Sequence, residues 1–148
     1  MVELGNNLNE HGRWLVEHVR AAGAAVVASN SGTGHPESAY IRVAATDAGR
    51  IVFGANVASR KVSNITADPR ISMVVMRGTT DEVQLEGEAR VLEGSEAAGA
   101  AQTLEAQHPG STDTRDPDSL RLVEVTVRWA LHTDVGAQPP VREELSLR

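Results

Sequence analysis

The alternation of apolar and polar residues along the chain predicts a mainly β protein. Period-two alternation, which buries one face of a strand, runs through residues 83–91 and again through residues 123–131. Shorter apolar segments predict further strands at residues 24–28, 39–46, 51–54 and 71–76. We therefore expect about six strands.

Three segments have the spacing and the end signals of helices. Residues 10–22 place their apolar side chains on one face, and Gly23 is a suitable residue to end the helix. Ser59 is a candidate cap for a helix over residues 59–67, and Asp68-Pro69 ends it. Residues 95–107 predict a third helix, capped by Ser95.

Short connections between the first strands favour an antiparallel sheet. Residues 30–37 have the composition of a loop, and Asp47-Ala48-Gly49 predicts a tight turn. A doubly wound parallel sheet would need a helix between most strands, and those helices are missing. We expect a single domain over residues 1–148, an antiparallel β-barrel with helices packed outside, and loosely held tails at residues 1–9 and 136–148.

Composition and charge exclude several classes of site and partner. The 148 residues include no cysteine, which excludes disulfides, thiolate nucleophiles and cysteine metal sites. A net charge of −6 argues against binding to nucleic acid or to anionic membranes. The sequence has no long apolar segment and no signal-peptide core near Met1, so we expect a cytoplasmic protein.

The triplet Ser59-Arg60-Lys61 is the strongest candidate for chemistry. It follows a predicted strand and opens a predicted helix, where free backbone N–H groups and the helix dipole favour an anion. Arg60 is suited to grip phosphate oxygens through two hydrogen bonds, and Lys61 adds a point charge. The other interpretation is a helix cap followed by solvated charges.

The order of motifs around this triplet resembles the pyridoxamine 5′-phosphate oxidase family. A strand, Asn56, Ser59-Arg60-Lys61, a helix, Asp68-Pro69-Arg70 and then residues 83–87 (VQLEG) follow one another at nearly the family's spacing. The resemblance covers about residues 24–92. It implies a split β-barrel that binds flavin mononucleotide (FMN), with Arg60 and Lys61 on the phosphate and Ser59 beside them. It also implies that Gly54 and Ala55 contact the flavin.

The sequence departs from the family pattern at several positions. The ends of residues 39–45 lack the arginine and lysine that serve the family's ligands, although Arg42 lies within this strand, either in contact with flavin or as a solvated charge. Glu82 takes the place of a family glutamine. Trp129, at a position where the family has a late tryptophan, is expected in the core. The family's arginine-rich C-terminal signature is not visible, so we expect a short relative rather than a true pyridoxamine 5′-phosphate oxidase.

The resemblance implies an FMN-dependent oxidoreductase that works as a homodimer with the cofactor between subunits. The candidate cofactor-binding residues are Arg60, Lys61, Ser59, Gly54, Ala55, Asn56, Arg42 and Glu82. The flavin itself performs the redox chemistry, so we assign no catalytic residue. The partners would be a small-molecule substrate or electron donor. The alternatives are a binding or carrier protein of the same fold for flavin, the deazaflavin F420 or haem, and a dimerising scaffold without cofactor.

Overall fold

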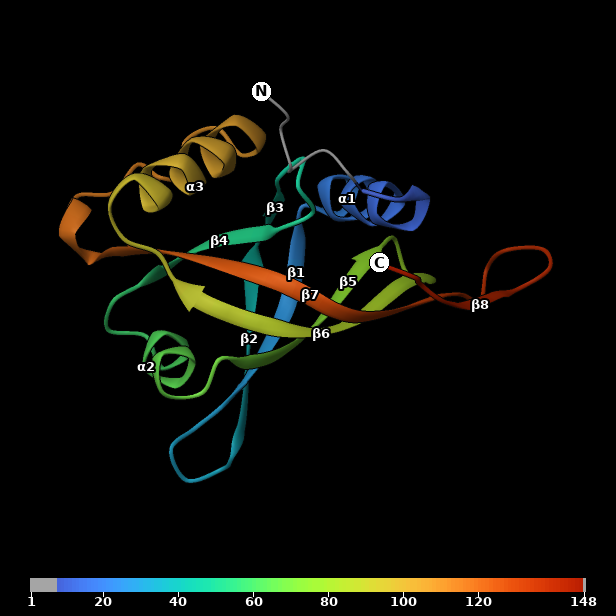
Figure 1. The fold of residues 1–148 in the computed structure, drawn as a ribbon, viewed down its shortest axis with the longest axis horizontal. Helices are drawn as coiled ribbons and strands as arrows, with labels where there is room; N and C mark the ends of the chain where they lie inside the picture. Colours follow the sequence, from blue (N-terminus) through green and yellow to red (C-terminus); the bar gives the residue numbers. More distant parts are fainter. Residues whose placement is uncertain (1–7, 148) are drawn as a thin grey trace.

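The computed structural model describes residues 8–147, which form eight strands, three α-helices and one 3₁₀ turn (Figure 1). The elements of the first half are, in chain order, α1 (Glu10–Ala22), β1 (Ala24–Asn30), β2 (Pro36–Arg42), β3 (Ala44–Ala45), β4 (Ile51–Asn56) and α2 (Arg60–Ala67). The second half contains β5 (Arg70–Arg77), β6 (Asp81–Val91), α3 (Gly94–Gln107), the 3₁₀ turn (Pro117–Ser119), β7 (Leu120–Asp134) and β8 (Val141–Glu144). The expected mainly β chain is confirmed. The expected strand over residues 39–46 is divided at Val43 into β2 and β3, and β8 is an additional strand.

The sheet is antiparallel throughout and curls into a barrel. Its strand order is β2-β1-β5-β6-β7-β4-β3, and β8 pairs with β7 beside this path. β2 and β3 lie at opposite ends of this order, yet only Val43 separates them in the chain. The sheet must therefore bend until its two edges are neighbours, which confirms the expected split barrel.

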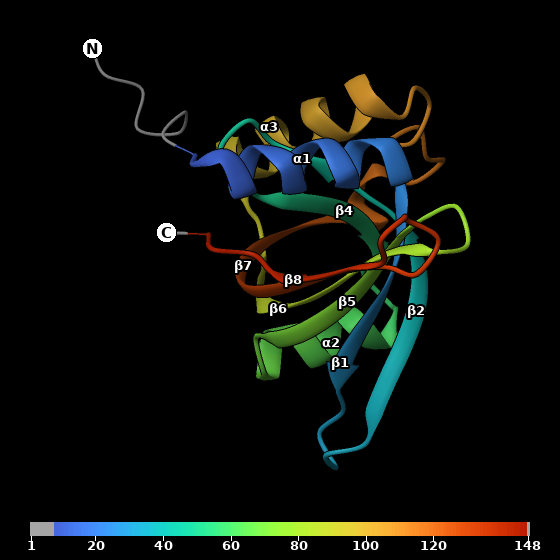
Figure 2. The same ribbon diagram turned by 90° about the vertical axis from the view of Figure 1, so that its right-hand side faces the viewer.

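The helices flank the barrel on different sides. In both Figure 1 and Figure 2, α1 and α3 lie along the upper side of the barrel, and α2 lies in the lower half near β1, with the β1–β2 hairpin extending below it. Asn9 caps α1 by accepting a hydrogen bond from the Gly12 N–H (2.8 Å), and Gly23 ends it with a φ of 71°. The expected cap at Ser95 is wrong, because α3 begins one residue earlier and Glu93 occupies the cap position.

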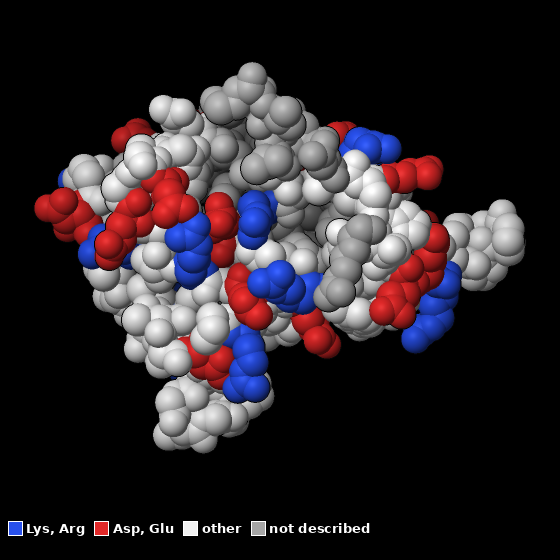
Figure 3. Space-filling model, viewed as in Figure 1, with Lys and Arg blue, Asp and Glu red and all other residues white. Residues whose placement is uncertain are grey.

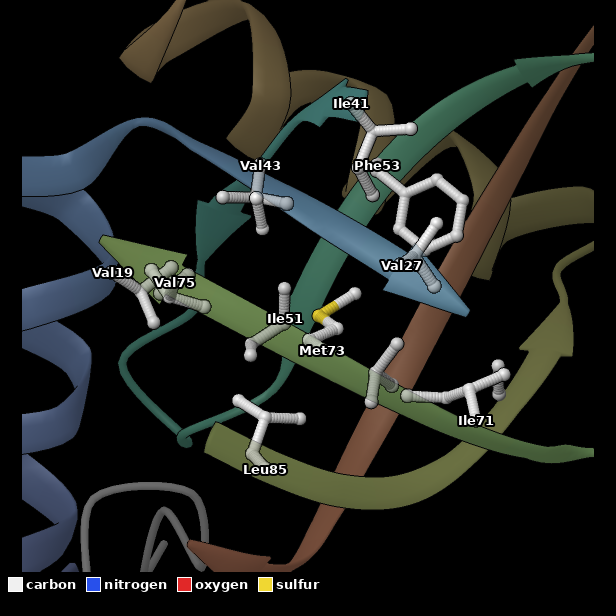
Figure 4. Close-up of a cluster of buried hydrophobic side chains, with 14 of the residues drawn as sticks. Val19, Val27, Ile41, Val43, Ile51, Phe53, Ile71, Met73, Val75 and Leu85 are labelled. Atoms are coloured by element: carbon white, nitrogen blue, oxygen red, sulfur yellow. The ribbon is translucent and has the colours of Figure 1, made fainter. Parts of the chain in front are cut away.

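The core fills the interior of the barrel with aliphatic side chains around one aromatic ring. Phe53 is fully buried, and the cluster to which it belongs draws side chains from α1 and from several strands, including Val19, Val27, Ile51, Met73 and Leu85 (Figure 4). A second, smaller cluster lies between α3 and the outer face of the barrel, with Val52, Leu104 and Leu122 among its members. β4 is therefore covered on both faces, which fixes its position.

A β-bulge between β6 and β7 changes which side chains of β7 face inward. The pairing shifts at Glu86/Gly87, opposite Val127 and Trp129. One extra residue reverses the alternation, so that Ala130 is fully buried while Trp129 is half-buried and outside the core. The expected core position of Trp129 is wrong for this reason.

The C-terminal segment is held by strand pairing and by the core, so the expected loose tail is wrong for residues 141–147. β8 pairs with β7, and the Leu145 N–H donates to the Ala130 carbonyl (2.9 Å). Leu145 is a buried member of the main core, and the Ser146 N–H donates to His11 of α1 (2.7 Å). Most of the expected N-terminal tail, residues 1–7, lies outside the described residues. Within residues 8–147, no helix has the length and apolarity needed to span a bilayer.

Candidate functional site

The loop between β4 and α2 is organised by Asn56. Its Oδ1 accepts a hydrogen bond from the Ala58 N–H (2.8 Å), and its carbonyl accepts from the Ser59 N–H and from the Ser59 hydroxyl (2.9 and 2.7 Å). Ser59 occupies the cap position, but its side chain makes no capping hydrogen bond to α2. The first turn of α2 therefore presents its N–H groups together with Arg60 and Lys61.

Two cavities lie next to this loop, one after the other along β2. The larger encloses about 320 Å³ and is lined by residues 40–42 of β2 and residues 54–56 of β4, with Lys61, Leu104, Ser111 and Leu120. The smaller encloses about 210 Å³ and is lined by residues 37–39 of β2 and residues 59–61, with Val27 and Ser29. Lys61 lines both, so the two cavities meet at its side chain.

The structure brings seven of the eight candidate residues to these two cavities. Five of them line the larger cavity: Arg42, Gly54, Ala55, Asn56 and Lys61. Ser59 and Arg60 join Lys61 in the smaller cavity. Glu82 lines neither, because it lies at the far end of the β5–β6 hairpin, paired with Met76 and Thr133. Binding of a cofactor by these residues remains a prediction.

The larger cavity has cations and no carboxylate among its lining residues. Among residues 8–147, no carboxylate lies within ion-pairing distance of Arg42 or Lys61. Elsewhere the surface is mixed, and Figure 3 shows acidic and basic side chains interspersed over one face of the molecule. The cavity is thus a local positive site on a chain of net charge −6, which suits a small anion better than a large polyanion.

An apolar wall closes the larger cavity beside Gly54. A Cβ atom on Gly54 would lie 3.1 Å from Leu120 Cδ1 and 3.5 Å from Leu104 Cδ2. The missing side chain therefore lets these two leucines approach the β4 backbone. The lining thus combines apolar side chains with cations, which suits a flat ring with an anionic tail.

The smaller cavity contains an acidic residue that the sequence analysis did not single out. Glu37 Oε2 pairs with Arg60 Nη1 at 2.5 Å. The composition of residues 30–37 predicts a loop that includes Glu37, whereas β2 begins at Pro36 and pairs Glu37 with Ser29. With the strand boundary placed correctly, alternation would have shown a charged residue on the inward face, which needs a partner.

A second polar cluster lies on another side of the barrel, under α1. His18 is buried, and its Nε2 donates to the Val75 carbonyl (3.0 Å), while Nδ1 has no hydrogen-bond partner among the described residues 8–147. Asp81 lies 3.9 Å from this Nδ1 and 2.7 Å from His132 Nε2. Trp14 stacks on the His18 ring and lies against the His132 ring in a tilted arrangement. Burial lowers the pKa of His18.

Comparison with protein-family models settles the family of this fold. The model described as pyridoxamine 5′-phosphate oxidase matches residues 15–134, which is most of the chain. The chain belongs to the pyridoxamine 5′-phosphate oxidase family. The match includes every candidate site residue and every residue that lines the two cavities, and it ends before β8. A search of the curated proteins found no match.

Solved structures of the same fold have different cofactors in their names. A pyridoxamine 5′-phosphate oxidase-related, FMN-binding protein from Nostoc punctiforme has a TM-score of 0.64 at 13% identity, with 89% of this chain and 85% of that chain covered. A haem-binding protein from Mycobacterium smegmatis has a TM-score of 0.69 at 18% identity, covering 88% and 57%. A structure named F420 reductase has a TM-score of 0.64 at 16% identity, covering 77% and 93%. At these identities the likeness concerns the fold alone.

Proposed function

We propose that the chain binds FMN across the two cavities, with the phosphate in the smaller one and the flavin ring in the larger one. The observation that carries the proposal is the position of Lys61, which lines both cavities where they meet. Ser59 and Arg60 supply further donors at the phosphate end, next to the open N–H groups of α2.

The lining of the larger cavity supports a flavin ring. Leu104 and Leu120 pack close to Gly54 and supply an apolar wall against which a ring can lie. Asn56 and Arg42 place polar groups at the rim. Haem is less well supported, because the side chains that commonly ligate haem iron are represented in the two linings by Tyr40 alone.

We further propose that the bound FMN makes the protein an oxidoreductase for a small organic molecule. The flavin supplies hydride or electron transfer, and the protein holds the ring, balances the charge of the phosphate and limits the access of water. The family and the structure named F420 reductase support this role. The second candidate is a carrier of FMN or F420 without turnover.

A homodimer completes the proposal. Tyr40, Val26 and Met76 are exposed apolar side chains on the outer face of the sheet, with exposed fractions of 79%, 40% and 36%. Val26 pairs directly with Tyr40, so this apolar area is continuous across β1 and β2. Exposed apolar areas of this kind favour association, and Arg42 of the larger cavity follows Tyr40 on the same face. Sedimentation analysis that finds a monomer would contradict the dimer.

The binding proposal is tested by titrating the protein with FMN and with riboflavin, which lacks the phosphate. Replacing Arg60 and Lys61 together with alanine should weaken FMN binding at least about tenfold, since charge-assisted contacts contribute about 1.5–3 kcal/mol each. Riboflavin binding should change little. Arg77→Ala with Arg142→Ala is the matched control, because it removes two charges from exposed positions that line neither cavity. Equal FMN affinity in the two double variants would contradict the proposed site.

The redox role has its own test. FMN-loaded protein is mixed without oxygen with a reduced nicotinamide, and the loss of the oxidised flavin absorbance band is followed. Rapid bleaching and its reversal by a small-molecule acceptor support an oxidoreductase. Flavin that binds tightly and is not reduced supports the carrier.

A further inference from the structure

Glu37 is held in the smaller cavity by two elements of the fold. Its side chain is 15% exposed, and one carboxylate oxygen pairs with Arg60 Nη1. The other oxygen accepts a hydrogen bond from Asn64 Nδ2 (2.7 Å), and that amide also donates to the Ser29 hydroxyl (3.1 Å). Ser29 and Asn64 are both buried. The carboxylate therefore has a fixed position, unlike an exposed surface charge.

This fixed position places a negative charge where the proposed phosphate would bind. Glu37 lines the same cavity as Ser59, Arg60 and Lys61. The formal charges of the cavity, one each from Arg60, Lys61 and Glu37, sum to +1. A phosphate diester carries one negative charge and matches this sum, whereas a phosphate monoester that has lost both protons carries two. The second charge would be repelled by Glu37 at short range.

We propose that Glu37 is a specificity-determining residue that makes the site favour a singly charged phosphate over a doubly charged one. The proposal depends on the function proposed above, because it assumes that a flavin phosphate enters the smaller cavity. Glu37 acts in two ways. It occupies one end of the Arg60 guanidinium, and its charge opposes the second charge of the ligand.

The test compares three flavins that differ only at the phosphate: riboflavin, FMN, and the methyl ester of FMN, which is a singly charged diester. In Glu37→Gln the amide oxygen still accepts from Asn64, and the negative charge is lost. We expect FMN affinity to rise about fivefold or more relative to the methyl ester at about pH 8, and riboflavin affinity to stay unchanged. Glu17→Gln, an exposed position on α1, removes the same charge away from the site and should leave the ratio unchanged.

A second measurement needs no variant. The second proton of a phosphate monoester leaves near a pKa of about 6. In the unchanged protein, the affinity for FMN relative to the methyl ester should therefore fall as the pH rises from about 5.5 to about 7.5.

The possible outcomes separate the two proposals. The affinity for FMN relative to its methyl ester could be the same in Glu37→Gln as in the unchanged protein and could also be independent of pH. That result would overturn the role of Glu37 and leave the flavin site intact. Weaker FMN binding in Glu37→Gln would also overturn it, because Glu37 would then serve to aim Arg60 at the phosphate. Failure of all three flavins to bind the unchanged protein would overturn the proposed function, and the role of Glu37 with it.

Discussion

Replacing Gly87 with alanine should strongly destabilise the barrel, because the bulge between β6 and β7 leaves no room for a side chain. A Cβ atom at this position would lie 2.3 Å from the Thr126 carbonyl oxygen and 3.2 Å from its carbonyl carbon. Both contacts involve backbone of the paired strand, which cannot rotate away as a flexible side chain would. Relief requires the two strands to separate by several tenths of an ångström at a buried position.

The loss of stability has two sources, a steric clash and a weakened hydrogen bond. Overpacking of a buried position costs about 1–3 kcal/mol, and a strained or broken ladder hydrogen bond costs about 1 kcal/mol more. We expect a loss of about 3 kcal/mol in the free energy of unfolding. For a domain of this size that corresponds to a melting temperature lower by about 6–12 °C, measured by circular dichroism or calorimetry.

Gly99→Ala is the matched control for this substitution. Gly99 lies on the exposed side of α3, and a Cβ atom there would meet nothing within 4 Å. Alanine is favoured over glycine in a helix by about 1 kcal/mol, so this variant should melt at the same temperature as the unchanged protein or higher. A Gly87→Ala protein that melts within about 1 °C of the unchanged one would refute the steric argument.

Two further predictions concern His18 and Leu145. Because burial lowers the pKa of His18 below its ordinary value of about 6.5, the unfolded chain takes up a proton first as the pH falls. The free energy of unfolding from urea titrations should therefore fall between about pH 7 and pH 5, and fall less in His18→Gln; parallel curves would contradict this. Leu145→Ala should cost about 2–5 kcal/mol, because Leu145 is buried in the main core, while exposed Val135→Ala should cost less than about 0.5 kcal/mol. Equal urea midpoints of unfolding for Leu145→Ala and Val135→Ala would show that the C-terminal segment is loosely held after all.

The parts of the fold that the sequence predicts well depend on local signals. The bounds of α1 match because Asn9, Gly23 and the apolar face all act within a few residues. The position of Ser59-Arg60-Lys61 at the start of α2 was likewise predictable, since the end of a strand and Asp68-Pro69 bracket a short helix. Seven of the eight candidate residues reach the cavities because six of them lie within residues 54–61, and the curl of the sheet brings the β2 edge, with Arg42, to the same place.

The parts that the sequence does not predict depend on pairing between distant segments. The residues just before β8 have the composition of a turn and include two prolines. The segment forms a strand because it pairs with β7 and because Leu145 is buried. Trp129 continues the alternation of the preceding valines in sequence, but the bulge changes the face on which it lies. Glu37 was missed because the residues before it have the composition of a loop, and the pairing with β1 extends further than that composition suggests.

The position of Glu82 links the cofactor site to the dimer. Glu82 pairs with Met76 and lies on the same outer face of the sheet as Tyr40 and Arg42, whereas its neighbour Val83 is buried inside the barrel. It lines neither cavity of its own chain. A role for Glu82 in cofactor binding therefore requires that a second copy cover this outer face and bring its own Glu82 toward the cavity. The candidate residues thus divide into seven that one chain brings together and one whose role depends on the proposed homodimer.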